Sequence, residues 1–188
     1  MIYEFALEPE LVAKWHDRKE YLFFDEKFGL NTGRMLSAYP KKWKKLVWKA
    51  FRSEFGSDDQ NAEMRLSALL DMLWENSVKR KSTFPDVPKW LERAEKEHDE
   101  RPFRAIIATR NPREHPHVLR SDDLVREGHA LWDIPDDPVI PRSAEDIANA
   151  AAPILRLCRH AVFADPHFDP NRERFRKPLE AMRVPVAL

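Results

Sequence analysis

The spacing of apolar residues changes at Pro102, and this change constrains the fold more than any other feature of the sequence. Before Pro102, apolar residues recur at the three- and four-residue intervals of amphipathic helices. After it, short apolar runs bounded by proline are typical of buried strands. We therefore predict an α+β fold, with a helical domain over residues 1–100 and a small α/β domain over residues 101–188. The small α/β domain is expected to be the first part of a larger domain that is truncated.

Four helices are predicted in the first hundred residues. The first follows Pro9 and ends before Gly29. The second is the clearest, since apolar residues mark one face between Pro40 and Gly56. The third starts near residue 58 or 59 and closes at the basic residues 79–81, and the fourth follows residue 88.

Short strands and helices are predicted after Pro102. Phe103–Thr109 and His117–Arg120 are expected to be strands, followed by a brief helix from Ser121. Ser143–Asp146 has the pattern of a capping box at the start of a further helix.

The end of the chain contains a third candidate strand. Ala161–Asp165 is apolar and runs directly into a polar turn. A last amphipathic helix presents Phe175, Leu179 and Met182, and Pro178 is expected to delay its start. Only eighteen residues follow Pro170, so we expect the chain to be a truncated relative or the N-terminal fragment of a longer protein.

The charges cancel overall but are arranged in blocks. Thirty-two basic residues balance thirty-two acidic ones, so no global field attracts nucleic acid or a membrane. Residues 14–52, however, hold eleven Lys/Arg and four Asp/Glu, whereas residues 121–147 hold two and eight. These blocks favour a docking role. We expect a protein partner, with nucleic acid as the alternative and self-association left open.

Other features predict a soluble cytoplasmic protein without a cofactor. No signal peptide is visible, and no apolar run approaches the roughly 20 residues that cross a bilayer. The single cysteine, Cys158, cannot form an internal disulfide, and we expect it to be a buried, inert thiol.

The segment Tyr39–Phe51 interleaves basic and aromatic residues. As a binding surface, its cations would contact phosphates and Trp48 would stack on a base. As an ordinary amphipathic helix, it would bury its aromatic residues and leave the lysines in solvent. The candidate nucleic-acid or partner-binding residues are Lys41, Lys42, Lys44, Lys45, Trp48, Lys49 and Arg52.

A second hypothesis places chemistry on histidine and aspartate residues. Asp165, His167 and Asp169 follow the candidate strand, and they would share one face of an extended segment. There they could hold a divalent ion that activates water, with His115 and His117 as contributors. The competing interpretation is a turn in which Asp169 caps the final helix. No spacing matches a specific metal template, so we expect no metal site.

The same region carries a resemblance. An apolar strand that ends in Asp-Pro-His-Phe, a turn, and a helix with Arg-Phe-Arg-x-Pro-Leu resemble the first βα unit of phospholipase D-like domains, over residues 161–182. Divergent bacterial members of that family are associated with mobile elements and anti-phage systems. Their catalytic signature is His-x-Lys with a later Asp, and no His-x-Lys occurs in this sequence.

Taken with the charge blocks, the resemblance implies a non-catalytic interaction module of a prokaryotic defence or mobile-element system. It would contact nucleic acid or an acidic protein. The alternative is a metal-dependent phosphodiesterase of phospholipase D-like ancestry.

Overall fold

A computed structural model describes residues 2–56, 59–80, 83–134, 139–157, 160–162, 164, 166–167 and 169–182. The chain divides into two compact units. One unit is Tyr3–Ile134, and the other is Pro135–Leu188 together with the first two residues. The division does not coincide with the expected boundary near residue 100, because strands from both sides of that position pair in one sheet.

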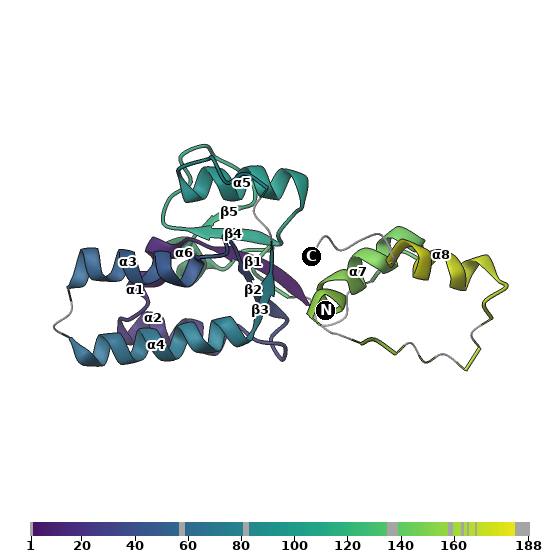
Figure 1. Cartoon of the computed structure of the whole chain (residues 1–188), viewed down its shortest axis with the longest axis horizontal. Helices are drawn as coiled ribbons and strands as arrows, with labels where there is room; N and C mark the ends of the chain where they lie inside the picture. Colours follow the sequence, from purple (N-terminus) through teal and green to yellow (C-terminus); the bar gives the residue numbers. More distant parts are fainter. Residues whose placement is uncertain are drawn as a thin grey trace. The chain divides into compact units, whose positions relative to one another are not determined.

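The larger unit is built on a parallel five-stranded sheet (Figure 1). Its strand order is β3-β2-β1-β4-β5, and all neighbouring pairs are parallel. The strands are β1 (Tyr3–Leu7), β2 (Arg34–Ala38), β3 (Ser77–Lys79), β4 (Ala105–Ala108) and β5 (Val118–Arg120). Since the order reverses between β1 and β4, the sheet has a doubly wound topology with its switch point at that pair.

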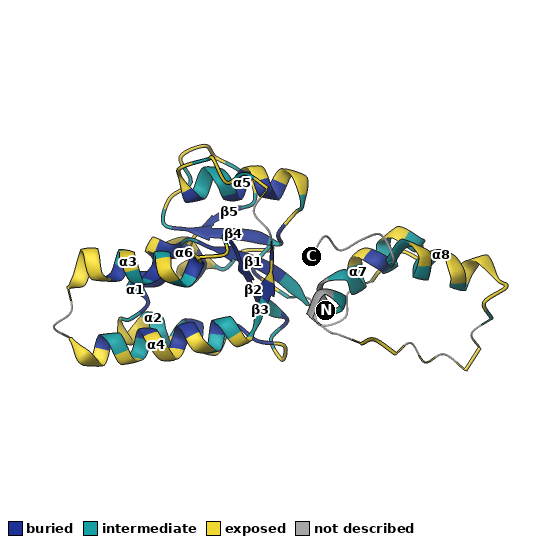
Figure 2. Ribbon diagram, viewed as in Figure 1, coloured by how far each residue is buried: buried dark blue, intermediate teal, exposed yellow. Residues whose placement is uncertain are grey.

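Helices cover both faces of this sheet. The helices of the larger unit are α1 (Pro9–Lys14), α2 (Arg18–Asp25), α3 (Trp43–Phe55), α4 (Gln60–Glu75), α5 (Trp90–Glu100) and α6 (Ser121–Glu127). One core cluster joins Phe5 and Leu7 of β1 to residues of α1, α2, α3, α4 and α6. The other joins Ala6, on the opposite face of the same strand, to Trp90 and Ala94 of α5. In Figure 2 the strands between these layers are almost entirely buried.

The mixed α and β content was predicted correctly, and so were most individual elements after Pro40. Helices α3 and α4 lie where the apolar spacing placed them, and the Asp59 carboxylate caps α4 by accepting a hydrogen bond from the Ala62 amide at 3.0 Å. Strands β4 and β5 fall inside the two predicted segments.

The expectation of an all-helical first hundred residues was wrong. Strands β1, β2 and β3 all lie there, and β3 occupies part of the segment that was expected to close the third helix. Strands β1 and β2 have helices on both sides, so their apolar residues do not alternate strictly with polar ones. Without alternation, runs of three to five residues carry little strand signal.

In its described residues, the smaller unit contains two helices, α7 (Ala144–Leu157) and α8 (Glu173–Met182). The predicted capping interaction precedes α7, because the Ser143 hydroxyl accepts a hydrogen bond from the Asp146 amide at 3.0 Å. Pro178 lies inside α8 instead of delaying its start.

The strand predicted at Ala161–Asp165 does not form in the described part of that segment. Residues 160–162 and 164 belong to no strand, and Val162 is 93% exposed. Asp165 itself lies outside the described residues, as does Cys158.

Candidate functional site

Helix α3 begins at the carboxyl edge of the sheet. The chain leaves β2, passes through Tyr39–Lys42 and enters the helix at Trp43. The Trp43 indole N–H donates a buried 2.7 Å hydrogen bond to the carbonyl of Leu7, the last residue of β1. This bond holds the start of α3 beside the switch point, so Lys41 and Lys42 lie at the edge where doubly wound folds bind ligands.

The two faces of α3 differ sharply in character. Trp43, Val47 and Phe51 are buried in the larger core cluster, as the helical spacing requires. Most of the cations point away from that core: Lys41, Lys42, Lys45, Lys49 and Arg52 are exposed. From residue 42 to residue 52 this row extends about 15 Å along the helix, at 1.5 Å per residue.

One predicted member of the surface is already engaged. The Lys44 ammonium pairs with Asp71 of α4 at 2.8 Å and lies 5.6 Å from the centre of the Trp74 ring. Lys44 therefore joins two helices, while none of the five exposed cations makes an ion pair with another described residue.

A surface hollow lies on this face of α3, lined by Lys45, Trp48, Lys49 and Arg52, with a volume of about 460 Å³. Trp48 is half-buried, and its ring meets Phe51 edge to face at 5.8 Å, which anchors one edge of the indole in the core. The Arg52 guanidinium lies 5.8 Å from the Trp48 ring centre. The hollow thus presents one fixed aromatic ring flanked by three cations.

The candidate histidines lie elsewhere, against α5. His115 and His117, in the loop between β4 and β5, are joined by His98 of α5. The ring centres of His98 and His117 are 4.4 Å apart, those of His98 and His115 are 5.4 Å apart, and those of His115 and His117 are 5.9 Å apart. We call these three residues the histidine cluster.

The hydrogen bonds of the histidine cluster disfavour metal binding. His98 Nδ1 accepts the Phe103 amide N–H at 3.3 Å, and His115 Nδ1 accepts the His117 amide N–H at 3.2 Å. A neutral ring whose Nδ1 accepts a hydrogen bond carries its proton on Nε2, so neither nitrogen offers a free lone pair. Consistently, no group of three or more His, Cys, Asp or Glu in the described part of the chain could hold a metal ion.

Of the three candidate residues at the end of the chain, Asp165 lies outside the described residues and His167 is exposed. Asp169 forms a turn ahead of α8, since its Oδ1 accepts the Asn171 amide at 3.0 Å and its Oδ2 lies 3.2 Å from Arg172 Nε. Asp169 therefore makes a turn, as in the competing interpretation, but it lies four residues before Glu173, the first residue of α8, and not at the position of a helix cap.

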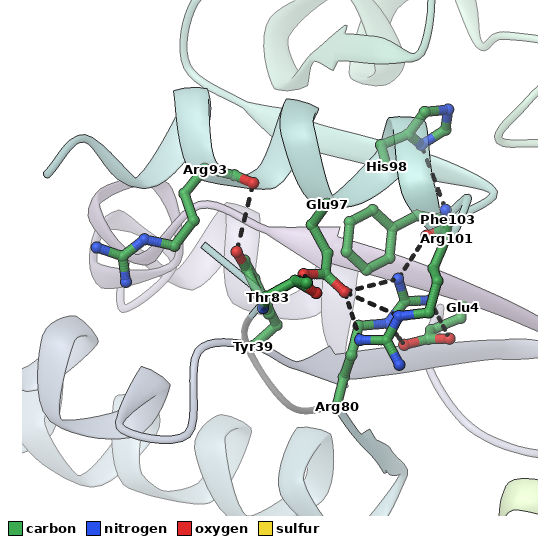
Figure 3. Close-up of polar contacts among 9 residues, drawn as sticks. All are labelled: Glu4, Tyr39, Arg80, Thr83, Arg93, Glu97, His98, Arg101 and Phe103. Atoms are coloured by element: carbon green, nitrogen blue, oxygen red, sulfur yellow. Dashed lines mark hydrogen bonds and ion pairs between the residues drawn. The ribbon is translucent and has the colours of Figure 1, made fainter. Parts of the chain in front are cut away.

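A buried ion network joins β1 to α5 and the residue after β3 (Figure 3). The Arg80 guanidinium donates to both carboxylate oxygens of Glu4, at 3.0 and 2.9 Å, and lies 3.6 Å from Glu97. Burial tends to raise the pKa of Glu97, but hydrogen bonds from Arg101 and Thr83 outweigh burial and hold that pKa below its ordinary value. The charged groups of this network pair with one another, so we assign the network to the stability of the fold and not to ligand binding.

A side chain bridges the ends of the two strands at the switch point. Glu8 follows β1, and its Oε2 accepts 2.7 Å hydrogen bonds from both the amide and the hydroxyl of Thr109, which follows β4. Together with the Trp43 bond to Leu7, this contact ties the ends of β1 and β4 to their surroundings.

Sequence reasoning predicted the exposed cations of α3 but not the contact of His98 with His115 and His117. The lysine and tryptophan spacing was a local signal, whereas His98 meets His115 and His117 only through the packing of α5 on the sheet. No protein-family model matches this sequence, and no curated protein or solved structure matches it either. None of the helices in the described regions has both the length and the apolar character required to span a bilayer.

Proposed function

We propose that this chain is a non-catalytic binding module that binds a single-stranded nucleic acid on the exposed face of α3. The observation that carries the proposal is the hollow in which Trp48 lies among Lys45, Lys49 and Arg52. A row of cations about 15 Å long can follow consecutive phosphates of one strand. An aromatic ring beside such a row is the usual platform for an unpaired base.

Trp48 favours nucleic acid over an acidic protein. A lysine row alone attracts any polyanion, because the attraction depends only on charge. An indole anchored in the core at one edge and open at the hollow adds a surface that a base can cover. The expected membership of a defence or mobile-element system is compatible with this activity and stays a prediction.

The test measures the binding of a short labelled oligonucleotide by fluorescence anisotropy over a range of salt concentrations. The triple variant Lys45→Glu, Lys49→Glu, Arg52→Glu should bind far more weakly. If each cation contacts one phosphate, the slope of log K against log salt should fall in magnitude by about 2. A matched control reverses Lys79, Lys89 and Arg126, three exposed cations outside this face, and should bind like the wild type.

A second variant separates the two classes of partner. Trp48→Leu keeps an apolar side chain against the core but removes the ring, and should cost about 1–3 kcal/mol of oligonucleotide binding. Its urea unfolding curve reports whether the fold is retained. If Trp48→Leu binds the oligonucleotide as tightly as the wild type, and polyphosphate competes equally well, the surface serves an acidic partner instead. If the α3 triple variant binds normally, α3 is not the binding surface.

A further inference from the structure

The histidine cluster has no part in the proposed nucleic-acid surface, and its geometry points to a regulatory device. His98 is 5% exposed and belongs to α5, whereas His115 and His117 belong to the loop that leaves β4. The rings of His98 and His117 are inclined by only 35° at a centre distance of 4.4 Å. Part of the contact between the loop and α5 is therefore made by titratable rings.

These contacts require neutral rings for two separate reasons. First, His98 and His115 each use Nδ1 as an acceptor for a backbone N–H, and a protonated ring has no lone pair there. Second, the three ring centres lie within 5.9 Å of one another, so charging one ring disfavours charging its neighbours.

The charged groups around His98 do not favour its protonation. Burial, followed by the proximity of His117 and His115, lowers the pKa of His98 to about 4, with Arg80 acting in the same direction and Asp99 against it. Other charged groups at this contact are already paired.

The Arg113 guanidinium of the loop donates to Glu95 of α5, and His115 Nε2 lies 3.6 Å from Asp99. The Arg113–Glu95 pair links the loop to α5 independently of the histidine protons, whereas a proton on His115 strengthens its contact with Asp99 and opposes release of the loop.

We propose that the histidine cluster is an acid-sensitive latch that holds the β4–β5 loop, residues 109–117, against α5. Above the ordinary titration range of histidine, His98 is neutral and the latch is closed. On acidification, a proton binds more strongly to a His98 ring that has left the cluster, so the loop separates from α5. The same loop contributes Asn111, Glu114, His115 and Pro116 to a surface cavity of about 310 Å³ that β5 and α6 also line, and release would alter its wall.

The test is amide hydrogen exchange, measured by NMR as protection factors between pH 7 and pH 4.5. The two informative amides are those of Phe103 and His117, which donate to the cluster. Each should lose at least tenfold in protection over this range. The amide of the buried Leu36 donates to the backbone carbonyl of Asn76 at 3.0 Å, an acceptor that does not titrate, and its protection should change much less.

A substitution identifies the group responsible. His98→Asn places an oxygen near the position of Nδ1, so it can accept the Phe103 amide without titrating. Protection of that amide should then vary less than threefold with pH, while His129→Asn should leave the wild-type behaviour intact.

Ring nitrogen shifts in the wild type give a readout that needs no variant. His98 and His115 should be Nε2–H tautomers at pH 7, and His98 should titrate far below 6.5. Constant protection of Phe103 and His117 down to pH 4.5, or a His98 titration near 6.5, overturns the proposal.

Discussion

The buried ion network gives the sharpest test of what holds the larger unit together. Arg80 is 7% exposed and Glu4 is 4% exposed, so neither charge is solvated by water. Arg80→Met removes the bidentate guanidinium but keeps most of the apolar volume. It leaves the carboxylates of Glu4 and Glu97 buried with fewer donors. Removing one partner of such a pair costs about 3–5 kcal/mol of the free energy of unfolding.

Urea unfolding followed by tryptophan fluorescence measures this loss, which should appear as a lower midpoint with an unchanged slope. At about 2–4 °C per kcal/mol, the melting temperature should fall by about 10 °C. Arg80→Lys keeps the positive charge but loses the planar guanidinium that binds both carboxylate oxygens. Its unfolding free energy should therefore lie between those of the wild type and Arg80→Met. The double variant Glu4→Gln, Arg80→Met should lose less unfolding free energy than the two single variants lose in total. The reason is that each substitution removes the charge that the other leaves buried without a partner.

A surface pair supplies the control. Lys44 and Asp71 are linked by an ion pair of 2.8 Å, comparable in length to the bonds of Arg80, but the Asp71 side chain is 66% exposed. Lys44→Met should therefore change the unfolding free energy by no more than about 1 kcal/mol. If Arg80→Met also costs less than that, burial does not strengthen the network and the reasoning fails.

Further predictions concern capping, the start of α3, pH and metal ions. Asp59→Ala should lower the unfolding free energy by about 1 kcal/mol in urea titrations, because it removes the α4 cap. Trp43→Phe should cost about 1–3 kcal/mol in the same assay, because the buried carbonyl of Leu7 loses its donor. His98 has a pKa of about 4 when folded and 6.5 as its ordinary value, so the unfolded chain binds more protons below pH 6.5. Stability should therefore fall from pH 6.5 to about 4 by at most about 3 kcal/mol, and His98→Asn should flatten that part of the curve. Zinc should not raise the melting temperature, and a rise of several degrees would contradict the Nε2–H tautomers inferred for the histidine cluster.

Local sequence patterns predicted the helices well because their signal lies within single elements. The apolar stripe through Trp43, Val47 and Phe51 identified α3 before any tertiary contact was known. The Asp59 cap and the capping interaction of Ser143 with Asp146 are likewise interactions between residues close in sequence.

What could not be predicted depends on contacts between distant residues. Strands β1, β2 and β3 are three to five residues long, and they are stable only because the sheet pairs them with each other and with β4. The Glu4–Arg80 pair joins residues seventy-six positions apart, and the contact of His98 with His117 depends on how α5 packs. Neither of these two contacts produces a pattern that can be recognised in a single sequence.

The sheet also explains why the two proposed activities can be tested separately. The buried face of α3 packs with Phe5 and Leu7 on one side of β1, whereas α5 packs with Ala6 on the other side. A charge reversal at Lys45, Lys49 or Arg52 changes exposed groups that make no ion pair with another described residue. Such a change should leave the His98 titration unaltered, while His98→Asn should leave oligonucleotide binding at pH 7.5 unaltered. A shift of the His98 titration in the α3 triple variant would mean that the two faces are coupled through β1, because that strand contributes to both cores.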